Sequence, residues 1–323
     1  YNMPDEIIWS IYADNEDLWL GTDAGLLLID RQTKHPYFIR PKNIDLNDSI
    51  YNIDALDEQN ILLSSTSGLS VVNKQTFHSQ SFADWMGGTG SLENKTVYNT
   101  YFDSLIPGRI WFATNRGLFF WQPGLDKPQY VSLSADKSIV QLQKVKQVRR
   151  DSAQRLWLGG DRLLGYLDQQ NNFHSISAPL AKGMGTASVN AIREVDTDLF
   201  WFGLKDHGAV EYNHKTGEVR SLTESWQVDC NGIYFIEEVG RYRLLGCPRS
   251  IIRFDTMTGD IIVLAPEDGF ISDELNEGAV YSAPEGLYVG TPDGAMLLDV
   301  DKLANRAQKD TILLESMSIY FEE

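Results

Sequence analysis

The stretch LWLGTDAGLLLID, residues 18–30, holds two short apolar runs on either side of a polar turn. Runs like its first half recur along the chain as ILLSS (61–65), IWFAT (110–114), LWLGG (156–160), FWFGL (200–204), RLLGC (243–247) and LYVGT (287–291). The small residue near the end of each run serves as a marker, and the markers are spaced 43 to 49 residues apart, at Gly21, Ser64, Ala113, Gly159, Gly203, Gly246 and Gly290. Self-similarity at such a period indicates a repeat architecture.

Each repeat has the composition of four short strands. A β-prone run precedes the marker, another follows it, and a fourth comes after a turn, as EVRSL and DIIVL do. Four strands per repeat of this length predict an all-β fold, a seven-bladed β-propeller of four-stranded antiparallel blades. The propeller is expected over 1–310, with repeats near 7–40, 50–82, 97–133, 145–178, 189–223, 231–265 and 276–300. Residues 311–323 either supply the last outer strand or begin a following β-sandwich domain.

Two further features repeat with the markers. An Asx residue follows the third strand in five repeats, where its side chain can accept bonds from the backbone of a hairpin turn: Asp30, Asn73, Asp168, Asn213 and Asp255. The residue two before each marker is large, and we expect it to fill the space between blades: Trp19, Leu62, Trp111, Trp157, Trp201, Leu244 and Tyr288. The small marker itself would let a neighbouring blade approach.

Composition excludes several classes of function. The chain has 323 residues, of which 42% are hydrophobic, and a net charge of −17, so we expect no nucleic-acid partner. No run of eighteen apolar residues is present to span a membrane. The first residues lack an initiator Met, and we expect a piece of a longer protein.

The repeats resemble the two-component regulator propeller family. The resemblance rests on VNAIREVDTDLFWFGL (189–204), IYADNEDLWLGTDAGLLLID (11–30) and the segment 268–299. It implies a periplasmic sensor domain that is joined, through a transmembrane helix outside this sequence, to a histidine kinase or a diguanylate cyclase. It also implies a homodimer, and contact with the membrane only through flanking segments.

No catalytic motif stands out, so we expect no enzyme, no cofactor and no metal site. The five histidines are scattered over four repeats. Two alternatives to a ligand sensor stay open: a protein-interaction scaffold, and a propeller lyase of the streptogramin-inactivating type, whose His and Glu residues find no counterpart here.

The sequence predicts a ligand site on one loop face. The loops after the second strand of repeats three to six each carry a cation, which would give a basic arc that suits a small polar or anionic ligand. The alternative is that these cations pair with Asp161, Asp206 or Asp229. Two tryptophans in the loops between repeats either stack on a ligand or pack on a blade edge. The candidate ligand-binding residues are Arg116, Arg162, Lys205, His207, Arg249, Trp85 and Trp226.

The two cysteines, Cys230 and Cys247, flank the first two strands of the sixth repeat. Pairing those strands about a turn near 238–241 brings the cysteines opposite each other. The sequence allows a disulfide, which would suit a periplasmic location, or two free buried thiols.

Overall fold

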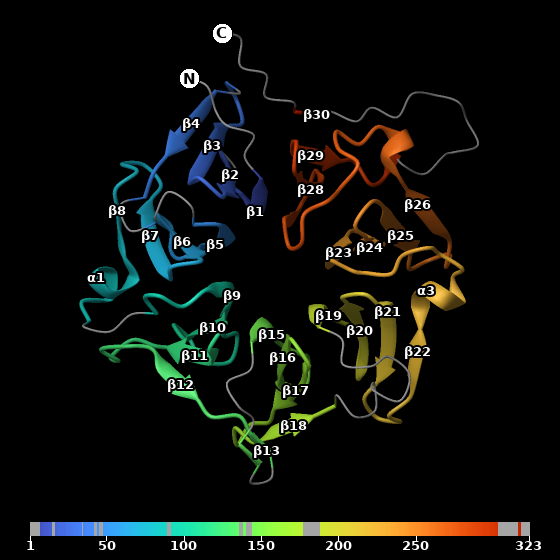
Figure 1. Ribbon diagram of the computed structural model, residues 1–323, viewed down its shortest axis with the longest axis horizontal. Helices are drawn as coiled ribbons and strands as arrows, with labels where there is room; N and C mark the ends of the chain where they lie inside the picture. The colour runs from blue at the N-terminus through green and yellow to red at the C-terminus, as the bar shows by residue number, and fades with distance from the viewer. Residues whose placement is uncertain are drawn as a thin grey trace.

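The computed structural model describes residues 7–14, 17–33, 35–41, 44, 48–88, 92–135, 138–139, 144–176, 188–302 and 316–317. Seven four-stranded antiparallel sheets stand around a central axis, each built from consecutive strands, so the predicted seven-bladed propeller is confirmed (Figure 1). We number the sheets as blades 1 to 7 in chain order. In each blade the first strand lies at the axis and the fourth at the rim (Figure 1).

The strands of the first four blades are as follows. Blade 1 has β1 (Ile8–Ala13), β2 (Asp17–Thr22), β3 (Leu26–Asp30) and β4 (Pro36–Ile39). Blade 2 has β5 (Ile50–Ala55), β6 (Asn60–Ser65), β7 (Leu69–Asn73) and β8 (Ser79–Ser81). Blade 3 has β9 (Val97–Phe102), β10 (Ile110–Thr114), β11 (Gly117–Trp121) and β12 (Gln129–Val131). Blade 4 has β15 (Val145–Arg150), β16 (Leu156–Gly160), β17 (Leu163–Leu167) and β18 (Phe173–Ser175).

The other three blades follow the same order. Blade 5 has β19 (Val189–Asp196), β20 (Leu199–Leu204), β21 (Gly208–Asn213) and β22 (Val219–Ser221). Blade 6 has β23 (Phe235–Val239), β24 (Tyr242–Gly246), β25 (Ile251–Asp255) and β26 (Ile261–Leu264). Blade 7 has β27 (Val280–Ala283), β28 (Gly286–Thr291), β29 (Gly294–Leu298) and β30 (Ser316–Met317). A small hairpin, β13 (Ser134–Ala135) with β14 (Ser138–Ile139), and the helices α1 (Phe82–Met86), α3 (Leu222–Ser225) and η1 (Pro266–Asp268) lie between blades.

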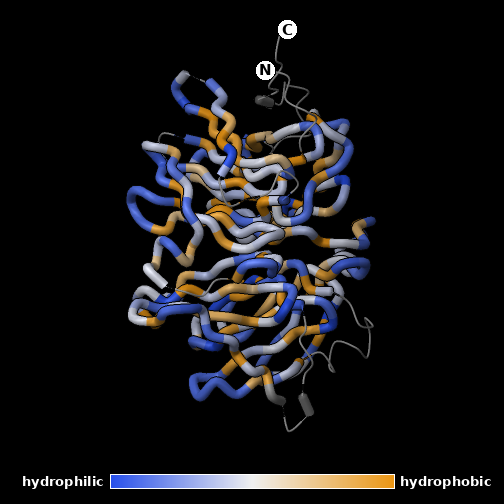
Figure 2. The backbone as a smooth tube through the Cα atoms, turned by 60° about the vertical axis from the view of Figure 1, so that its left-hand side comes forward, coloured by the Kyte–Doolittle hydropathy of each residue, from blue (hydrophilic) through white to orange (hydrophobic). Residues whose placement is uncertain are grey.

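The core lies between neighbouring blades. The large residue two before each marker is buried in all seven blades, as expected. Trp157, for example, is 1% exposed and packs on Phe200 of blade 5, with ring centroids 4.3 Å apart. Apolar residues follow the strands inside the ring, and polar residues gather in the turns and loops around it (Figure 2).

The small markers make room for the next blade. A Cβ on Gly203 would lie 2.5 Å from Cγ2 of Ile233 in the segment leading into blade 6, and one on Gly290 would lie 2.9 Å from Cγ2 of Ile8 in blade 1. The second contact closes the ring, together with a hydrogen bond of 2.7 Å from Asn276 Nδ2 to the Ile8 carbonyl. Gly246 is an exception, because there a Cβ would meet the ring of Phe235 in its own blade.

The predicted Asx turns are present in all five repeats. Oδ1 of each Asx residue accepts bonds from backbone N–H groups two to four residues ahead, at Asp30, Asn73, Asp168, Asn213 and Asp255. Turns between the first two strands also use carboxylates, and in blade 4 Asp151 accepts from the indole Nε1 of Trp157 at 2.7 Å. The Asx side chains thus stabilise the turns, and a carboxylate such as Asp151 also holds a buried tryptophan in place.

Cys230 and Cys247 are joined by a disulfide, with Cα atoms 5.8 Å apart. Val239 pairs with Tyr242, so the hairpin turns within the expected segment. Of the two alternatives that the sequence allowed, the structure has the disulfide.

The fourth strand of blade 7 comes from the end of the chain, where Ser316 and Met317 pair with Met296 and Ala295 of β29. The other residues of 311–323 lie outside the described ones, so the assignment of that segment as a whole stays a prediction.

Candidate functional site

The first strands of five blades carry a β-bulge at the end nearest the loop face. In β1 the register shifts between Ile8 and Ser10, which leaves Trp9 as the extra residue. The same shift occurs in β5, β9, β15 and β19. A bulge re-aims its extra side chain, and these residues converge on the axis: Trp9, Tyr51, Tyr98, Lys146 and Asn190.

They open into one cavity of about 230 Å³ at the mouth of the central channel, which we call the axial cavity. All seven blades contribute to its lining, through their first strands or the segments leading into them. The lining residues are Trp9, Tyr51, Tyr98, Lys144, Lys146, Gln147, Asn190, Tyr234, Glu277 and Gly278.

One wall of the axial cavity is aromatic. Trp9 meets Tyr51 edge-on at 5.8 Å between ring centroids, and Tyr51 meets Tyr98 at 5.5 Å. The indole Nε1 of Trp9 is buried and has no acceptor among the residues that the structure describes. On the other side, burial and the charges of Glu277, Glu274 and Asp206 raise the pKa of Tyr234, so its hydroxyl stays protonated as a donor.

The facing wall is charged. The ammonium of Lys146 donates to Asn190 Oδ1 at 3.1 Å and to Glu277 Oε1 at 2.6 Å. The ammonium of Lys144 lies over the Tyr98 ring, 4.6 Å from its centroid. Burial alone would lower the pKa of Lys144, but the Tyr98 hydroxyl and the carboxylates of Asp161 and Glu277 raise it, so Lys144 keeps its charge.

A second ring of side chains lies further along the channel, and we call it the lower ring. Its members stand on the first strand of each blade, opposite the large residue of the second strand, as Arg149 stands opposite Trp157. They are Tyr12, Asp54, Tyr101, Arg149, Arg193, Glu237 and Tyr281.

The predicted cations lie at the same end of the ring as the axial cavity, because the second strand of each blade ends beside the start of the first. They are exposed in the loops after the second strand: Arg116, Arg162, Lys205, His207 and Arg249. None of them lines the axial cavity.

Of the aspartates offered as partners of these cations, Asp161 binds elsewhere, and Arg249 lies near a different aspartate. Asp161 lies 3.8 Å from Lys144 and accepts from Ser188, while Arg249 lies 3.7 Å from Asp273, with both side chains mostly exposed. Within the described chain, no ion pair is formed by Arg116 or Arg162. The cations therefore lie around the mouth of the axial cavity and do not line it.

The two candidate tryptophans lie in a short helix or at its end, and they pack between blades. Trp85 in α1 stacks on Phe82 at 5.6 Å and meets Trp121 of blade 3 at 5.9 Å. Trp226, the C-cap of α3, stacks on Phe254 of blade 6 at 5.6 Å. Both side chains are half-buried. Of the two alternatives for these tryptophans, the structure has packing on a blade edge. The loop expected around Trp85 is a helix capped by Ser81.

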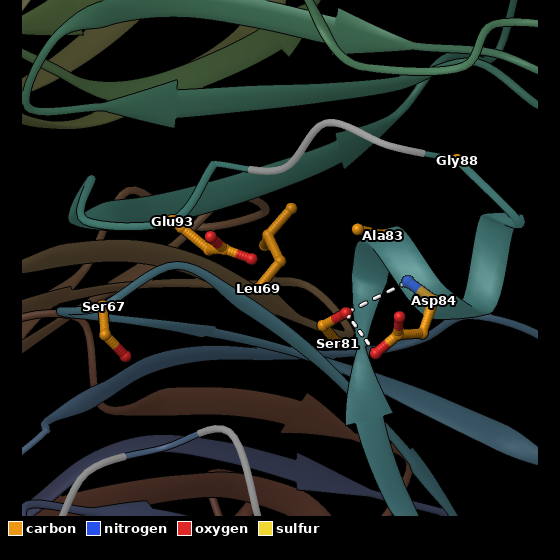
Figure 3. A pocket seen from close by; sticks show the side chains of 7 residues that line it. All are labelled: Ser67, Leu69, Ser81, Ala83, Asp84, Gly88 and Glu93. Carbon is orange, nitrogen blue, oxygen red and sulfur yellow. Dashed lines mark hydrogen bonds between the residues drawn. The ribbon is translucent and has the colours of Figure 1, made fainter.

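A second hollow, of about 450 Å³, lies beside α1 on blade 2 (Figure 3). The described residues of its lining include two carboxylates and no cation, and Asp84 accepts from Ser81 Oγ at 2.8 Å. Nothing in it gathers donors as the axial cavity does. Among the described residues there is no group of three or more His, Cys, Asp or Glu that could hold a metal, and no helix is long and apolar enough to cross a membrane.

Comparison with known proteins supports the fold. No family model matches the chain, and no curated protein does. Among solved structures, it is similar to the extracellular domain of the putative hybrid two component system BT3049 from B. thetaiotaomicron, with a TM-score of 0.77 and 17% identity over 95% of this chain and 41% of that one.

The extracellular domain of the putative hybrid two component system BT4673 from the same organism is similar too. Its TM-score is 0.72 at 16% identity, over 91% of this chain and 38% of that one. The WD40 propeller domain of Doa1 matches with a TM-score of 0.64 at 13% identity, over 91% of this chain and 92% of that one.

The chain thus spans about two fifths of the two sensor chains that it matches. The chain shares its propeller fold with these extracellular domains and with the WD40 domain of Doa1.

Proposed function

We propose that the chain is a ligand-sensing propeller from the periplasmic part of a bacterial membrane signalling protein, and that its ligand is a small polar or anionic molecule bound in the axial cavity. The fold shared with extracellular domains of two-component systems supports the sensing role. The disulfide between Cys230 and Cys247 supports an oxidising compartment.

The observation that carries the proposal is the convergence of all seven blades on one cavity. Hydrogen-bond donors predominate there, namely the Trp9 indole, the tyrosine hydroxyls and the ammonium groups of Lys144 and Lys146. Such a set complements carboxylate, phosphate or carbonyl oxygens. The aromatic wall would hold the apolar face of the ligand, as binding pockets usually do.

The exposed cations around the mouth have a supporting part in this proposal. In a chain of net charge −17, the arc from Arg116 to Arg249 gives an approaching anion a locally favourable path. We therefore expect these residues to affect the association rate and its salt dependence more than the final affinity.

A thermal-shift screen of the purified chain against sugars, organic acids, nucleotides and divalent metals tests the proposal. A ligand at a hundredfold excess over its Kd stabilises the fold by ~2.7 kcal/mol. We expect Lys146→Gln to abolish the shift of a hit, and Arg162→Gln, the matched control at the rim, to keep most of it.

The opposite pattern would move the site to the rim. The unliganded Tm of each variant shows whether the substitution itself harms the fold. If no compound in the panel shifts the Tm of the wild type, the ligand proposal fails, and a scaffold that binds a protein partner takes its place.

A further inference from the structure

The lower ring brings two arginines together at the end of the channel away from the axial cavity. Arg149 stands on β15 opposite Trp157, and Arg193 stands on β19 opposite Trp201, so they hold equivalent places in neighbouring blades. The strands β15 and β19 pack against each other along the axis. Side chains at these positions lean toward the next blade, as Arg193 does when it meets Glu237 of blade 6.

On its far side Arg193 faces two carboxylates of blade 6. Its Nη2 lies 3.3 Å from Glu237 Oε2 and its Nε lies 3.9 Å from Glu238 Oε2. Glu237 also accepts from Ser282 at 3.1 Å, and Glu238 also accepts from Arg243 at 3.1 Å. The carboxylates of blade 6 are therefore committed to Arg193, Arg243 and Ser282.

The charges of this cluster do not cancel. Three guanidinium groups, those of Arg149, Arg193 and Arg243, face the carboxylates of Glu237 and Glu238, which leaves one positive charge. It belongs to Arg149, whose side chain is exposed and open to a ligand, and whose guanidinium makes no hydrogen bond or ion pair with any residue that the structure describes. The protein around the Arg149 guanidinium displaces part of its water and lowers its pKa, and the neighbouring charge of Arg193 lowers it further, with partial relief from Glu237, Tyr101 and Glu238.

We infer that Arg149, with Arg193 beside it, forms a second binding site in the channel for a small carboxylate or phosphate anion. The guanidinium of Arg149 offers a planar fork of N–H donors that matches either anion in a bidentate way. An anion there would supply the missing negative charge and relieve the repulsion between the two arginines. The site is distinct from the axial cavity, since no residue is shared between them.

Anion-dependent stability tests the site. The thermal unfolding of the wild type is followed in a non-coordinating buffer at constant ionic strength, with inorganic phosphate and succinate as probes at rising concentration. We expect one or both to raise the Tm in a saturable way. Arg149→Gln should lose this shift, and Arg40→Gln, which removes an exposed arginine of equal charge after β4 at the rim, should keep it.

Two further measurements keep the test decisive. In buffer alone, Arg149→Gln should unfold at the wild-type Tm or above it, because the lost charge has no partner; a large fall would mean that Arg149 has a structural role and would overturn the inference. Arg149→Lys, which keeps the charge but lacks the fork, should bind the probes at least tenfold more weakly.

Equal phosphate and succinate shifts in wild type and Arg149→Gln, or no saturable shift in the wild type, would also overturn the inference. If Lys146→Gln loses the Tm shift of the screened ligand but keeps the phosphate and succinate shifts, the two sites are separate. Either proposal can therefore fail without the other.

Discussion

Between the blades, the position two before each marker holds Trp, Tyr or Leu in every repeat, whereas the equivalent axial positions hold Trp, Tyr, Tyr, Lys, Asn, Tyr and Gly. The first set is buried and apolar in all seven blades. The second set mixes aromatic, cationic and amide groups around one cavity. Repetition thus marks the residues that build the ring, and departure from it marks the residues that give the axis its chemistry.

The physical reason lies in what each position meets. A residue between blades faces the same environment seven times, because each blade packs on the next by the same rotation. A residue at the axis faces the channel, where packing restricts only the size of its side chain. Its chemical type can therefore differ from blade to blade and suit a ligand. The comparison can be tested by substitutions at paired positions, which remove a buried side chain, fill the space at a glycine or neutralise a carboxylate.

Trp157→Ala should give the largest effect. The indole is 1% exposed, packs on Phe200 and Phe202 of the next blade, and donates to Asp151. Loss of a buried aromatic side chain of this size costs about 3–5 kcal/mol. Urea unfolding followed by fluorescence should show this fall in the free energy of unfolding.

Tyr98→Ala is the axial counterpart for that experiment. Tyr98 is half-buried against the channel, so its truncation should cost less than half as much. Equal losses for the two variants would contradict the division between a structural layer and a functional axis.

Gly203→Ala should have an intermediate effect. Its Cβ would lie 2.5 Å from Cγ2 of Ile233 and 3.1 Å from the Cβ of Ala191, so blades 5 and 6 would have to separate. Overpacking of a core contact costs about 1–3 kcal/mol. Thermal unfolding should report a lower Tm.

Gly232→Ala is a close control, since the nearest atom to its added Cβ is 3.6 Å away. It should unfold near the wild-type Tm. If Gly203→Ala were as stable as this control, the small markers would not be set by the approach of the next blade.

The sequence predicted the layer between blades well because its signals repeat. Trp157 and Gly159 recur in the same places in other repeats, and the Asx turn recurs in five, so each occurrence supports the others. The short helices had a usable signal that was missed: Ser81 with Asp84, and Ser221 with Glu224, have the spacing of an N-cap and its acidic partner. One helix contains Trp85 and the other ends at Trp226, where the sequence predicted open loops.

The residues that line the axial cavity were not predicted, and the bulges explain why. An extra residue in the first strand interrupts the alternation of inward and outward side chains, so counting by twos from Tyr12 of the lower ring leads to Ser10 and not to Trp9. The equivalent axial positions also hold different types of residue, such as Lys146 and Tyr51, so a search for repeats would not align them. The cations in the loops were easy to find because four repeats carry one, but the structure places them around the cavity, not in it.

The smallest expected effect on stability comes from two carboxylates, one between blades and one at the axis. Burial would raise the pKa of Asp103, between blades 3 and 4, but bonds from Arg150, Trp111 and the Leu105 N–H hold it at about 2. Asp54, at the axis, has no cation among its hydrogen-bond partners in the part of the chain that the structure describes. Burial raises its pKa to about 6 against the bonds it accepts from Thr100 and Asn52.

These shifts predict opposite dependences of stability on pH. Asp103 has a folded pKa below its unfolded value of 3.8, so its contribution is present above about pH 4 and is lost as the pH falls toward 2. Asp54 has a folded pKa above 3.8, so its ionisation weakens the fold as the pH rises from about 4 to about 6.

Asp54→Asn should therefore be more stable than the wild type at pH 7, by about 1 kcal/mol, because water in the channel screens part of the burial cost. The amide keeps an oxygen to accept from Thr100 and Asn52. At pH 4 the two proteins should unfold at nearly the same urea concentration. Asp103→Asn should lose stability at pH 7, since it leaves the buried Arg150 unpaired. If Asp54→Asn were also destabilised at pH 7, the channel would hold that carboxylate by interactions as strong as those between the blades.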